Sequence, residues 1–450
     1  MNTEVGHRVL VANRGEIAVR VIRAVHSVGW EAVAVYSDAD ADALWVRMAD
    51  DAVHLGASPA SKSYLDIDKV VNAARDSGCD LVHPGYGFLS ERASFARAVR
   101  DAGLIFVGPS AEVIETMGDK AAARRTASEA GVPIVPGSDV LSSPDAALEY
   151  ARQVGYPVLV KASSGGGGRG IRFVDNPDDL AAAVVTAQSE ARSAFGDDAV
   201  YLEKVIVDAR HVEVQVIADQ HGAVGHAFER DCSVQRRRQK LLEEAPAPEL
   251  SADLRTAMLE ASVALTRQVG YVGAGTMEYL VAGEDFYFIE MNTRIQVEHP
   301  ISEQITGLDL VAEQLRIAIG EPLSFDPAQV VVTGVCFEFR INAEDPVRDF
   351  FPSPGTLERF DLPGGPGVRV ESGYVAGGIV SPYYDSLLAK IVVHGRDRAE
   401  AIARSVQALS ELQIEGVAHT RDLHLRLLRE SEVARGPVST AWLETYLGNS

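Results

Sequence analysis

The stretch from Arg8 to Ser37, RVLVANRGEIAVRVIRAVHSVGWEAVAVYS, decides the fold of the first part of the chain. An apolar run (8–14) precedes a segment with the spacing of an amphipathic helix (16–29), and a second apolar run follows (31–37). A strand, a helix and a second strand in this order predict parallel strands connected by a helix that covers one face of the sheet. We therefore expect an α/β domain with a doubly wound parallel sheet.

The same alternation continues to about residue 110, in CDLVHPG, SFARAVRDAG and LIFVGPS. Loops at the carboxyl ends of the strands are where open α/β sheets present ligand-facing groups. We expect two such loops, from Asn13 to Glu16 and from His83 to Phe88, to face a ligand. A plain tight turn is the alternative interpretation of each loop.

The length and composition are those of a multidomain enzyme. The chain has 450 residues, which at roughly 150 residues per domain predicts about three domains. A net charge of −22 disfavours a broad surface for nucleic acid or anionic lipid, so we expect small molecules and proteins as partners. Three cysteines without a CxxC pair argue against structural zinc, and we find no leader and no apolar run long enough for a membrane helix. We expect a cytoplasmic protein.

A glycine-rich segment lies in the second part of the chain, YPVLVKASSGGGGRGIRF (156–173). Consecutive glycines let backbone amides approach and surround phosphate oxygens, and Lys161 adds a positive charge. The segment differs from the GxxxxGK[ST] loop because its lysine precedes the glycines. The pattern predicts a triphosphate-binding loop, and a flexible surface hinge is the alternative.

Two charged segments follow the glycine-rich loop. In VYLEKVIV, Glu203 and Lys204 lie between apolar residues, where a backbone hinge could bind an adenine edge; a solvated charge pair is the alternative. Residues 229–240, ERDCSVQRRRQK, concentrate basic side chains in an acidic chain. A solvated face is the usual explanation of such a run. Its acidic surroundings and the break at EEAPAP support an anion-binding pocket instead.

The strongest local signal is FYFIEMNTRIQVEHP (286–300). While this segment stays extended, alternate side chains point to one face. The polar members of that face are Glu290, Asn292, Arg294, Gln296 and Glu298. Glu278 lies on the preceding strand, and pairing through the AGED turn would place it opposite Glu290. Oxygen ligands without histidine or cysteine are typical of magnesium. We expect metal-binding carboxylates here, with Arg294 holding a planar anion and Glu298 acting as a general base; a coincidental polar sheet face is the alternative.

Together these motifs closely resemble the biotin carboxylases of the ATP-grasp superfamily. The glycine loop, LEK, ERDCS…QRR…QK and EMNTRIQVEHP carry the resemblance. The blocks VANRGEIA, HPGYGFLSE, MGDK, EEAPAP, RINAEDP, PSPG and SPYYDS extend it over essentially the whole chain. It implies an N-terminal domain (1–118), an ATP-grasp domain (119–325) with a mobile lid at about 138–207, and a C-terminal β-rich domain (326–450).

The resemblance also implies a role for each matching residue. Contacts to ATP are expected from Lys120, Lys161, Gly165, Gly166, Gly167, Gly168, Glu203, Lys204, Ile206, His211, Gln235 and Glu278. Two magnesium ions, or manganese, are expected on Glu278, Glu290 and Asn292. The bicarbonate pocket and catalytic groups are expected to be Lys240, Arg294, Gln296 and Val297, with Glu298 as the base. Arg340 is expected to steady carboxyphosphate and the biotin enolate, and Tyr86 to lie near biotin.

The activity implied is that of an ATP-dependent carbon–nitrogen ligase, which activates bicarbonate as carboxyphosphate and carboxylates biotin. No AMKM-like attachment motif occurs, so biotin is expected on a separate biotin carboxyl carrier protein, with a carboxyltransferase as a further partner. Arg20 and Arg23 match positions near the dimer contact of bacterial relatives, which predicts a homodimer. By analogy we expect acetyl-CoA as the final acceptor; propionyl-CoA, longer acyl-CoAs and pyruvate stay open.

Two departures from the family pattern and two rival functions complete the interpretation. Arg238 stands where some members have histidine, and Ser164 replaces the first of five glycines, so nucleotide affinity and lid stiffness are expected to differ. Other ATP-grasp ligases are the first rival: HPGYGFLSE, RINAED and PYYDS argue against a carbamoyl-phosphate synthetase half and a purine-synthesis carboxylase, whereas an acyl-CoA carboxylase with an unusual acceptor stays open. A degenerate regulatory subunit is disfavoured because the metal ligands, Arg294, Glu298 and Arg340 are all retained.

Overall fold

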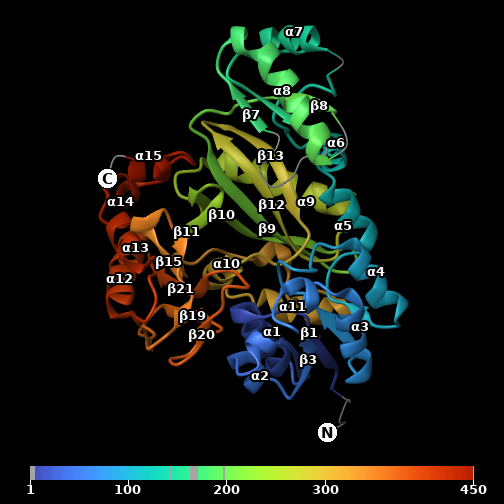
Figure 1. Cartoon of the computed structure of the whole chain (residues 1–450), viewed down its shortest axis with the longest axis vertical. Coiled ribbons are helices and arrows are strands. Elements are labelled where there is room, and N and C mark those ends of the chain that lie inside the picture. The colour runs from blue at the N-terminus through green and yellow to red at the C-terminus, as the bar shows by residue number, and fades with distance from the viewer. Residues whose placement is uncertain (1–5, 142, 163–170, 196–197, 449–450) are drawn as a thin grey trace.

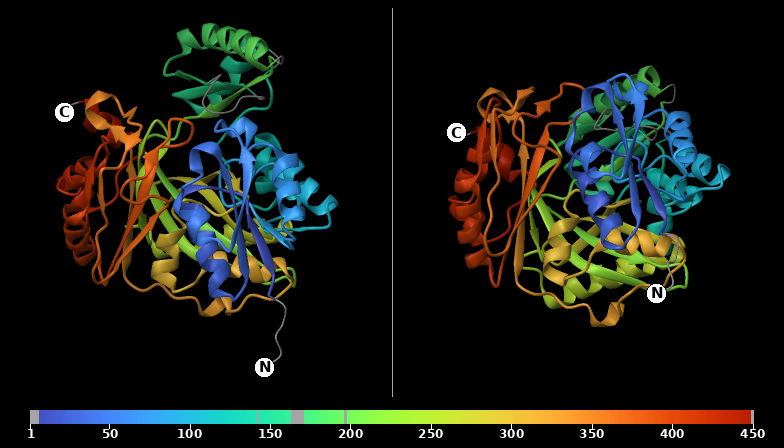
Figure 2. Two further views of the ribbon diagram at one scale, coloured as in Figure 1. Left: turned by 60° about the horizontal axis from the view of Figure 1, so that its bottom comes forward. Right: turned by 90° about the horizontal axis from the view of Figure 1, so that it is seen from below.

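The computed structural model describes residues 6–141, 143–162, 171–195 and 198–448. The glycines expected to cradle phosphate, Gly165 to Gly168, and the preceding Ser164 lie outside these residues. Figure 1 shows the N-terminal part in blue, the central part in green and yellow, and the C-terminal part in red. The small unit that carries α7 (Pro144–Val154) and α8 (Pro177–Phe195) projects from one end of the molecule (Figures 1 and 2).

The N-terminal part is built on the expected parallel sheet. Its strands have the order β3-β2-β1-β4-β5, and every adjacent pair is parallel. They are β1 (Arg8–Val11), β2 (Glu31–Ser37), β3 (Asp51–Gly56), β4 (Leu81–His83) and β5 (Ile105–Phe106). The helices are α1 (Gly15–Ser27), α2 (Leu44–Met48), α3 (Ile67–Asp76) and α4 (Ala93–Asp101). The reversal of strand order at β1 confirms the predicted doubly wound topology.

The small unit packs two helices on a three-stranded antiparallel sheet. After α5 (Ala111–Gly118) and α6 (Lys120–Glu129), it comprises α7 (Pro144–Val154), β6 (Val158–Ala162), β7 (Ile171–Val174), α8 (Pro177–Phe195) and β8 (Val200–Lys204). The strand order is β7-β6-β8. Val158, Val160 and Leu202 are buried against Leu180 and Val184. In the sequence, the glycine-rich segment stands between β6 and β7.

An eight-stranded antiparallel sheet forms the centre of the molecule, in the order β13-β12-β9-β10-β11-β14-β21-β19. Its strands are β9 (Arg210–Ala218), β10 (Val224–Arg236), β11 (Gln239–Ala245), β12 (Gly273–Ala282), β13 (Asp285–Asn292), β14 (Val335–Asn342), β19 (Val368–Ser372) and β21 (Leu387–Gly395). Helices α9 (Ala252–Gln268), α10 (His299–Thr306) and α11 (Leu310–Ala318) pack on it. The pairing of β11 with β14 makes one sheet out of the second and third parts of the chain.

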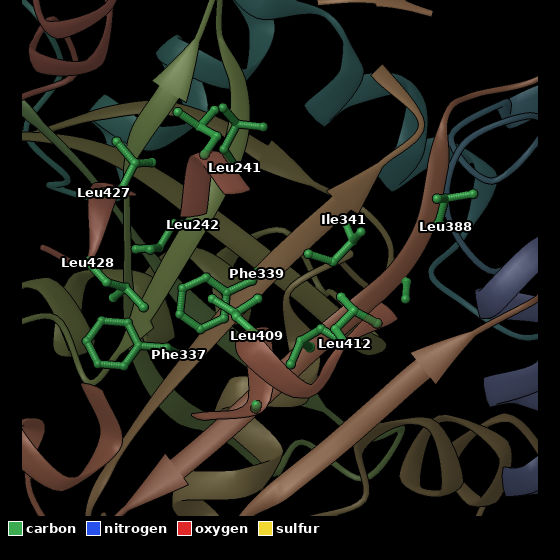
Figure 3. Packing of buried hydrophobic residues seen from close by; sticks show 14 of the residues in the cluster. Leu241, Leu242, Phe337, Phe339, Ile341, Leu388, Leu409, Leu412, Leu427 and Leu428 are labelled. Atoms are coloured by element: carbon green, nitrogen blue, oxygen red, sulfur yellow. The ribbon is translucent and has the colours of Figure 1, made fainter. Parts of the chain in front are cut away.

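A helical layer covers the C-terminal end of this sheet. It comprises α12 (Arg398–Glu411), α13 (Arg421–Leu427), α14 (Ser431–Arg435) and α15 (Trp442–Gly448). Figure 3 shows Phe337, Phe339 and Ile341 of β14 packed among leucines that include Leu409 and Leu412. Short strands complete this part: β15 (Glu344–Asp345), β16 (Phe351–Pro352), β17 (Gly355–Thr356), β18 (Arg359–Asp361), β20 (Ile379–Val380) and β22 (Gln413–Glu415). Within the described ranges, no helix combines the length and apolar character that crossing a membrane requires.

Candidate active site

The predicted pair of carboxylates lies on neighbouring strands. Glu278 of β12 and Glu290 of β13 are directly opposed, as the AGED turn predicted. The Oε1 atom of Glu278 accepts a hydrogen bond from Asn292 Nδ2 at 2.9 Å. Glu290 pairs with Lys120, whose Nζ lies 3.9 Å from Oε2. Burial and the negative charge of Glu278 raise the pKa of Glu290. Two opposed carboxylates that repel each other, one of them partly exposed, are a donor set that fits a divalent cation.

The extended segment after these carboxylates is shorter than the sequence predicted. Strand β13 ends at Asn292, the chain then bends, and α10 begins at His299 with a proline in its first turn. The polar side chains still converge. Arg294 NH1 donates to Gln296 Oε1 at 3.1 Å and Arg294 NH2 to Asn292 Oδ1 at 3.2 Å. Gln296 Nε2 donates to Glu278 Oε1 at 3.0 Å.

A tight turn in the basic segment brings Lys240 to the carboxylates. Arg237 and Arg238 both have positive φ angles, and they form the turn between β10 and β11. Lys240 Nζ lies 2.6 Å from Glu213, 3.2 Å from Glu278 and 2.6 Å from Glu298. The basic segment thus has two destinations. Lys240 points to the carboxylates, whereas Arg237 pairs with Asp349 on the surface.

Glu298 is fully buried between two cations. Its Oε1 atom accepts from Lys240 Nζ, and its Oε2 atom accepts from Arg340 NH2 at 3.0 Å. Burial would raise the pKa of Glu298, but Lys240, Arg340 and Arg230 outweigh burial and hold the pKa well below its usual range. Glu298 is therefore an anion that can accept a proton once its cations are engaged elsewhere.

Arg340 reaches Glu298 because β14 pairs with β11. Its Nε atom donates to Glu243 Oε1 at 2.6 Å, while NH2 contacts both Glu243 and Glu298. Among the described residues, NH1 of Arg340 makes no hydrogen bond. Behind the side chain, Thr420 Oγ1 and His424 Nε2 bind the backbone carbonyl of Arg340 at 3.0 and 2.8 Å. The guanidinium is thus held on one edge and offers NH1 to a ligand.

The residues expected near the nucleotide divide into two groups. Lys161 and Arg124 both pair with Glu203 on the small unit. Lys204 Nζ donates to the carbonyls of residues 155 and 156 at 2.9 Å, so its side chain anchors the same unit. His211 Nε2 lies 3.0 Å from Glu278 Oε2 and Nδ1 lies 3.4 Å from Gln235 Nε2. His211 and Gln235 therefore adjoin the carboxylates. Ile206 is half-buried in the segment that joins them to the small unit.

The two N-terminal loops lie together and contact the C-terminal part. Asn13 Nδ2 donates to the backbone carbonyls of Pro84 and Tyr86 at 2.7 Å. The hydroxyl of Tyr86 donates to Glu16. Lys390 of β21 lies 3.0 Å from Glu16 Oε1 and donates to the Val297 carbonyl at 2.7 Å. Lys390 of the C-terminal part thus connects Val297, which precedes Glu298, to Glu16 of the N-terminal part.

Several charged residues around the site were not singled out from the sequence. They are Glu91, Glu213, Glu243 and Lys390. Glu16 and Arg230 lie in segments that the sequence did indicate, the loop 13–16 and the basic run 229–240. Arg230 has 0% exposure and donates to Glu213 Oε1 at 2.6 Å, Gln215 Oε1 at 2.8 Å and Ser302 Oγ at 2.9 Å. Charges inside apolar strands such as VEVQVIAD are the only sequence signal for such a network.

The arginines expected near a dimer contact border a surface hollow. Arg20 is buried and donates to Glu303 at 2.8 Å and to Asp309 at 2.5 Å. Arg23 is half-exposed and pairs with Glu371 at 3.1 Å. Both arginines line a hollow of about 550 Å³. Of these two arginines, Arg23 is the one whose side chain is exposed to another molecule.

Comparisons with known protein families match three successive segments of the chain. Residues 5–114 match the family model of the biotin carboxylase N-terminal domain, and residues 119–325 match that of the carbamoyl-phosphate synthase L chain ATP-binding domain. Residues 338–445 match the biotin carboxylase C-terminal domain.

Two curated relatives have nearly the same extent as this chain. Biotin carboxylase 1 of Bacillus subtilis (strain 168) is 49% identical over 98% of this chain and 98% of that protein. A pyruvate carboxylase subunit of Methanothermobacter thermautotrophicus is 48% identical over 98% of this chain and 90% of that protein.

Solved structures agree in fold with the whole chain. The biotin carboxylase from Campylobacter jejuni, solved as a β-γ-ATP complex, superposes with a TM-score of 0.92, at 44% identity over 97% of this chain and 98% of that chain. The biotin carboxylase domain dimer of the Hydrogenobacter thermophilus 2-oxoglutarate carboxylase has a TM-score of 0.91, at 45% identity over 98% and 97%. That dimer was solved with MgADP, ADP and bicarbonate.

Proposed function

The chain belongs to the biotin carboxylase family of ATP-dependent ligases, and from this premise we propose that it carboxylates biotin on a separate carrier protein. One observation supports the proposal above all others. Glu298, a buried anion, contacts Lys240 and Arg340 and lies beside the opposed carboxylates Glu278 and Glu290. A general base, two cations beside it and a metal-binding pair are what the activation of bicarbonate by ATP requires.

The substrates are assigned to three neighbouring places. We assign the ATP phosphates to Lys120, Lys161 and the glycine loop, and adenine to the segment from Glu203 to Ile206, with His211 and Gln235 beside them. Glu278, Glu290 and Asn292 would hold magnesium or manganese, which when bound supplies positive charge to the ATP phosphates. We assign bicarbonate to Lys240, Arg294, Gln296 and Val297. The nucleotide, magnesium and bicarbonate of the Hydrogenobacter domain support these assignments by family likeness.

The first chemical step transfers the γ-phosphoryl group. Glu298 takes the bicarbonate proton, a bicarbonate oxygen attacks the γ-phosphorus, and the bond to the bridging oxygen breaks to release ADP. Lys240 and Arg340 neutralise Glu298 while the site is free of anions. When bicarbonate and phosphate enter, these cations can turn to the new anions, and the basicity of Glu298 then rises.

The second step uses carboxyphosphate, the product of the first. Its carbon–oxygen bond breaks to give carbon dioxide and phosphate, phosphate takes the ureido proton of biotin, and the biotin nitrogen attacks carbon dioxide. Arg340 steadies the anions through NH1, and Tyr86 borders the place of biotin. Closure of the unit at about 138–207 would exclude water from carboxyphosphate.

We further propose an acyl-CoA carboxylase as the parent complex, with acetyl-CoA or propionyl-CoA as acceptor. The 49% identity to Biotin carboxylase 1 of Bacillus subtilis over 98% of this chain supports biotin carboxylation as the part of the overall reaction that this chain performs. The 48% identity to a pyruvate carboxylase subunit favours pyruvate as the second candidate. A homodimer through the hollow at Arg23 and the domain limits 1–118, 119–325 and 326–450 belong to the same proposal.

The activity is tested by ADP release from the purified chain with ATP, magnesium and bicarbonate, with and without free biotin. Turnover should need bicarbonate and increase with biotin. A chain that hydrolyses ATP at the same rate without either compound would contradict the proposal. The acceptor is tested separately, by adding acyl-CoA or pyruvate carboxyltransferase and carrier proteins and measuring which acceptor is carboxylated.

A further inference from the structure

A buried acid behind the proposed site, Glu338, has no role in the mechanism above. It lies on β14 two residues before Arg340, and therefore on the same face of the sheet. Its exposure is 0%, and neither of its carboxyl oxygens has a hydrogen-bond partner among the described residues. A carboxylate buried in this way is rarely stable, because nothing replaces the water that would solvate its charge.

The register of the sheet places a second buried carboxyl group beside Glu338. Glu243 of β11 is its directly opposed partner, and its exposure is also 0%. The Oε1 atom of Glu243 accepts from Arg340, whereas Oε2 is buried and has no hydrogen-bond partner in the described parts of the chain. Opposed side chains in an antiparallel pair have Cβ atoms roughly 4.5–5.5 Å apart. One proton between the two carboxyl groups would therefore satisfy an oxygen of each.

Apolar side chains border Glu338 on one side. Cys336 precedes it on the same face of β14 and belongs to a buried cluster with residues of α10, β11 and β21. The other members of this cluster are Ala245, Ile301, Ile305 and Val392. Glu338 thus stands at the boundary between a dry cluster and the charged site, where the neutral form of a carboxyl group is favoured.

The charged groups that face Glu338 are already engaged with other partners. From β21, Lys390 binds the Val297 carbonyl at 2.7 Å. On β14, Arg340 binds Glu243 and Glu298. Burial raises the pKa of Glu338 well above its usual value; Lys390 and Arg340 oppose this rise, and Glu243 and Glu298 add to it.

We propose that Glu338 is an uncharged carboxylic acid in the working enzyme and donates its proton in a hydrogen bond to Oε2 of Glu243, which positions Arg340. Buried neutral acids that act as hydrogen-bond donors are known in enzyme sites. The donated bond fixes the carboxylate of Glu243, whose Oε1 holds the Nε edge of Arg340, and NH1 then stays directed to the ligand. Glu338 touches no substrate, so it is a positioning residue, and its effect on turnover rests on the function proposed above.

The protonation state can be measured without any activity. Infrared spectra of the intact wild type at pH 7 should contain the carbonyl stretch of a protonated carboxylic acid, well separated from the carboxylate bands. The band should be lost in Glu338→Gln and shifted in Glu243→Gln, which changes its partner. Glu411→Gln, at an exposed glutamate, is the matched control and should keep the band. Identical spectra of the wild type and Glu338→Gln would overturn the proposal.

Kinetics test the positioning role. Glutamine keeps a neutral donor at this position, whereas leucine removes it. Glu338→Gln should keep kcat for biotin carboxylation within about twofold, while Glu338→Leu should lower kcat about tenfold with the KM for ATP unchanged, as expected for one hydrogen bond to a charged group. Equal losses in both variants, or none in either, would refute the role of Glu338. A wild type without biotin-dependent turnover would refute the proposed function instead, and the infrared band would still decide the protonation state. If the leucine variant does not fold, the glutamine variant and the spectra remain decisive.

Discussion

Acid should destabilise this protein through His424, the buried imidazole that binds the backbone of Arg340. Its exposure is 0%, and its Nε2 atom lies 2.8 Å from the Arg340 carbonyl oxygen. Its ring packs edge-on against Phe339, with the two ring centroids 5.5 Å apart. Burial lowers the pKa of His424 from 6.5 to about 4, although the Arg340 carbonyl opposes this change. The unfolded chain therefore takes up a proton near pH 6.5, and the folded chain does so only near pH 4.

The magnitude follows from linkage between protonation and folding. The stability that depends on neutral His424 is complete above pH 6.5 and is lost as the pH falls towards 4, for a total of about 3.4 kcal/mol. By pH 5 about 2 kcal/mol of it is lost. Urea denaturation of the wild type and of His424→Gln, which keeps a donor for the Arg340 carbonyl, should be compared at pH 7.5 and pH 5.

The glutamine variant should lose about 2 kcal/mol less stability than the wild type between these two pH values. His221→Gln is the matched control, since His221 is exposed and its Nε2 atom also lies 2.8 Å from a backbone carbonyl. This control should keep the acid-dependent loss of the wild type. Equal pH dependence in the wild type and in His424→Gln would refute the reasoning.

Three further outcomes are expected. Glu298→Gln should lower bicarbonate-dependent turnover by about a hundredfold or more, the usual contribution of a general base, with ATP binding measured by calorimetry unchanged; near-normal turnover would exclude this residue as the base. Arg230→Met should cost about 3–5 kcal/mol of stability, because Glu213 would be left buried beside fewer cations. Arg97→Met, at an exposed ion pair, is the control and should change the unfolding midpoint little. Equal shifts of the midpoint for the two variants in a thermal scan would contradict this reasoning. Removal of divalent ions by a chelator should abolish turnover and magnesium or manganese should restore it, so turnover that persists without added metal would count against the Glu278–Glu290 pair as a metal site.

The pairing of Glu278 with Glu290 is the part of the site that sequence alone predicts best. Both residues lie on strands joined by a short turn, so the local pattern predicts that they lie close together. Their direct opposition depends on a register shift between Glu278 and Tyr279, without which the turn would pair Glu278 with Ile289. The parallel N-terminal sheet was predictable for a similar reason, because its strands and helices alternate with distinct apolar spacings. The condition that the segment stays extended holds only as far as Asn292, because the chain bends there before the helix that begins at His299.

The contacts of Glu298 could not be derived from local patterns. Lys240 and Arg340 reach Glu298 only because the turn at Arg237 orders β10 and β11 and because β11 then pairs with β14. The buried acids escaped notice for a related reason. A polar residue that alternates with apolar ones usually marks a solvent-facing side of a strand, whereas here α10 covers the face that bears Glu338.

The most direct test of the account is the fate of labelled bicarbonate. The purified chain is incubated with ATP, magnesium, biotin and ¹³C-bicarbonate, and biotin is then examined by mass spectrometry, with Glu298→Gln as the matched sample. The account predicts biotin that carries one labelled carboxyl group, formed only with ATP and reduced about a hundredfold or more in the variant. Hydrolysis of ATP without labelled biotin, or equal labelling by the variant, would contradict it.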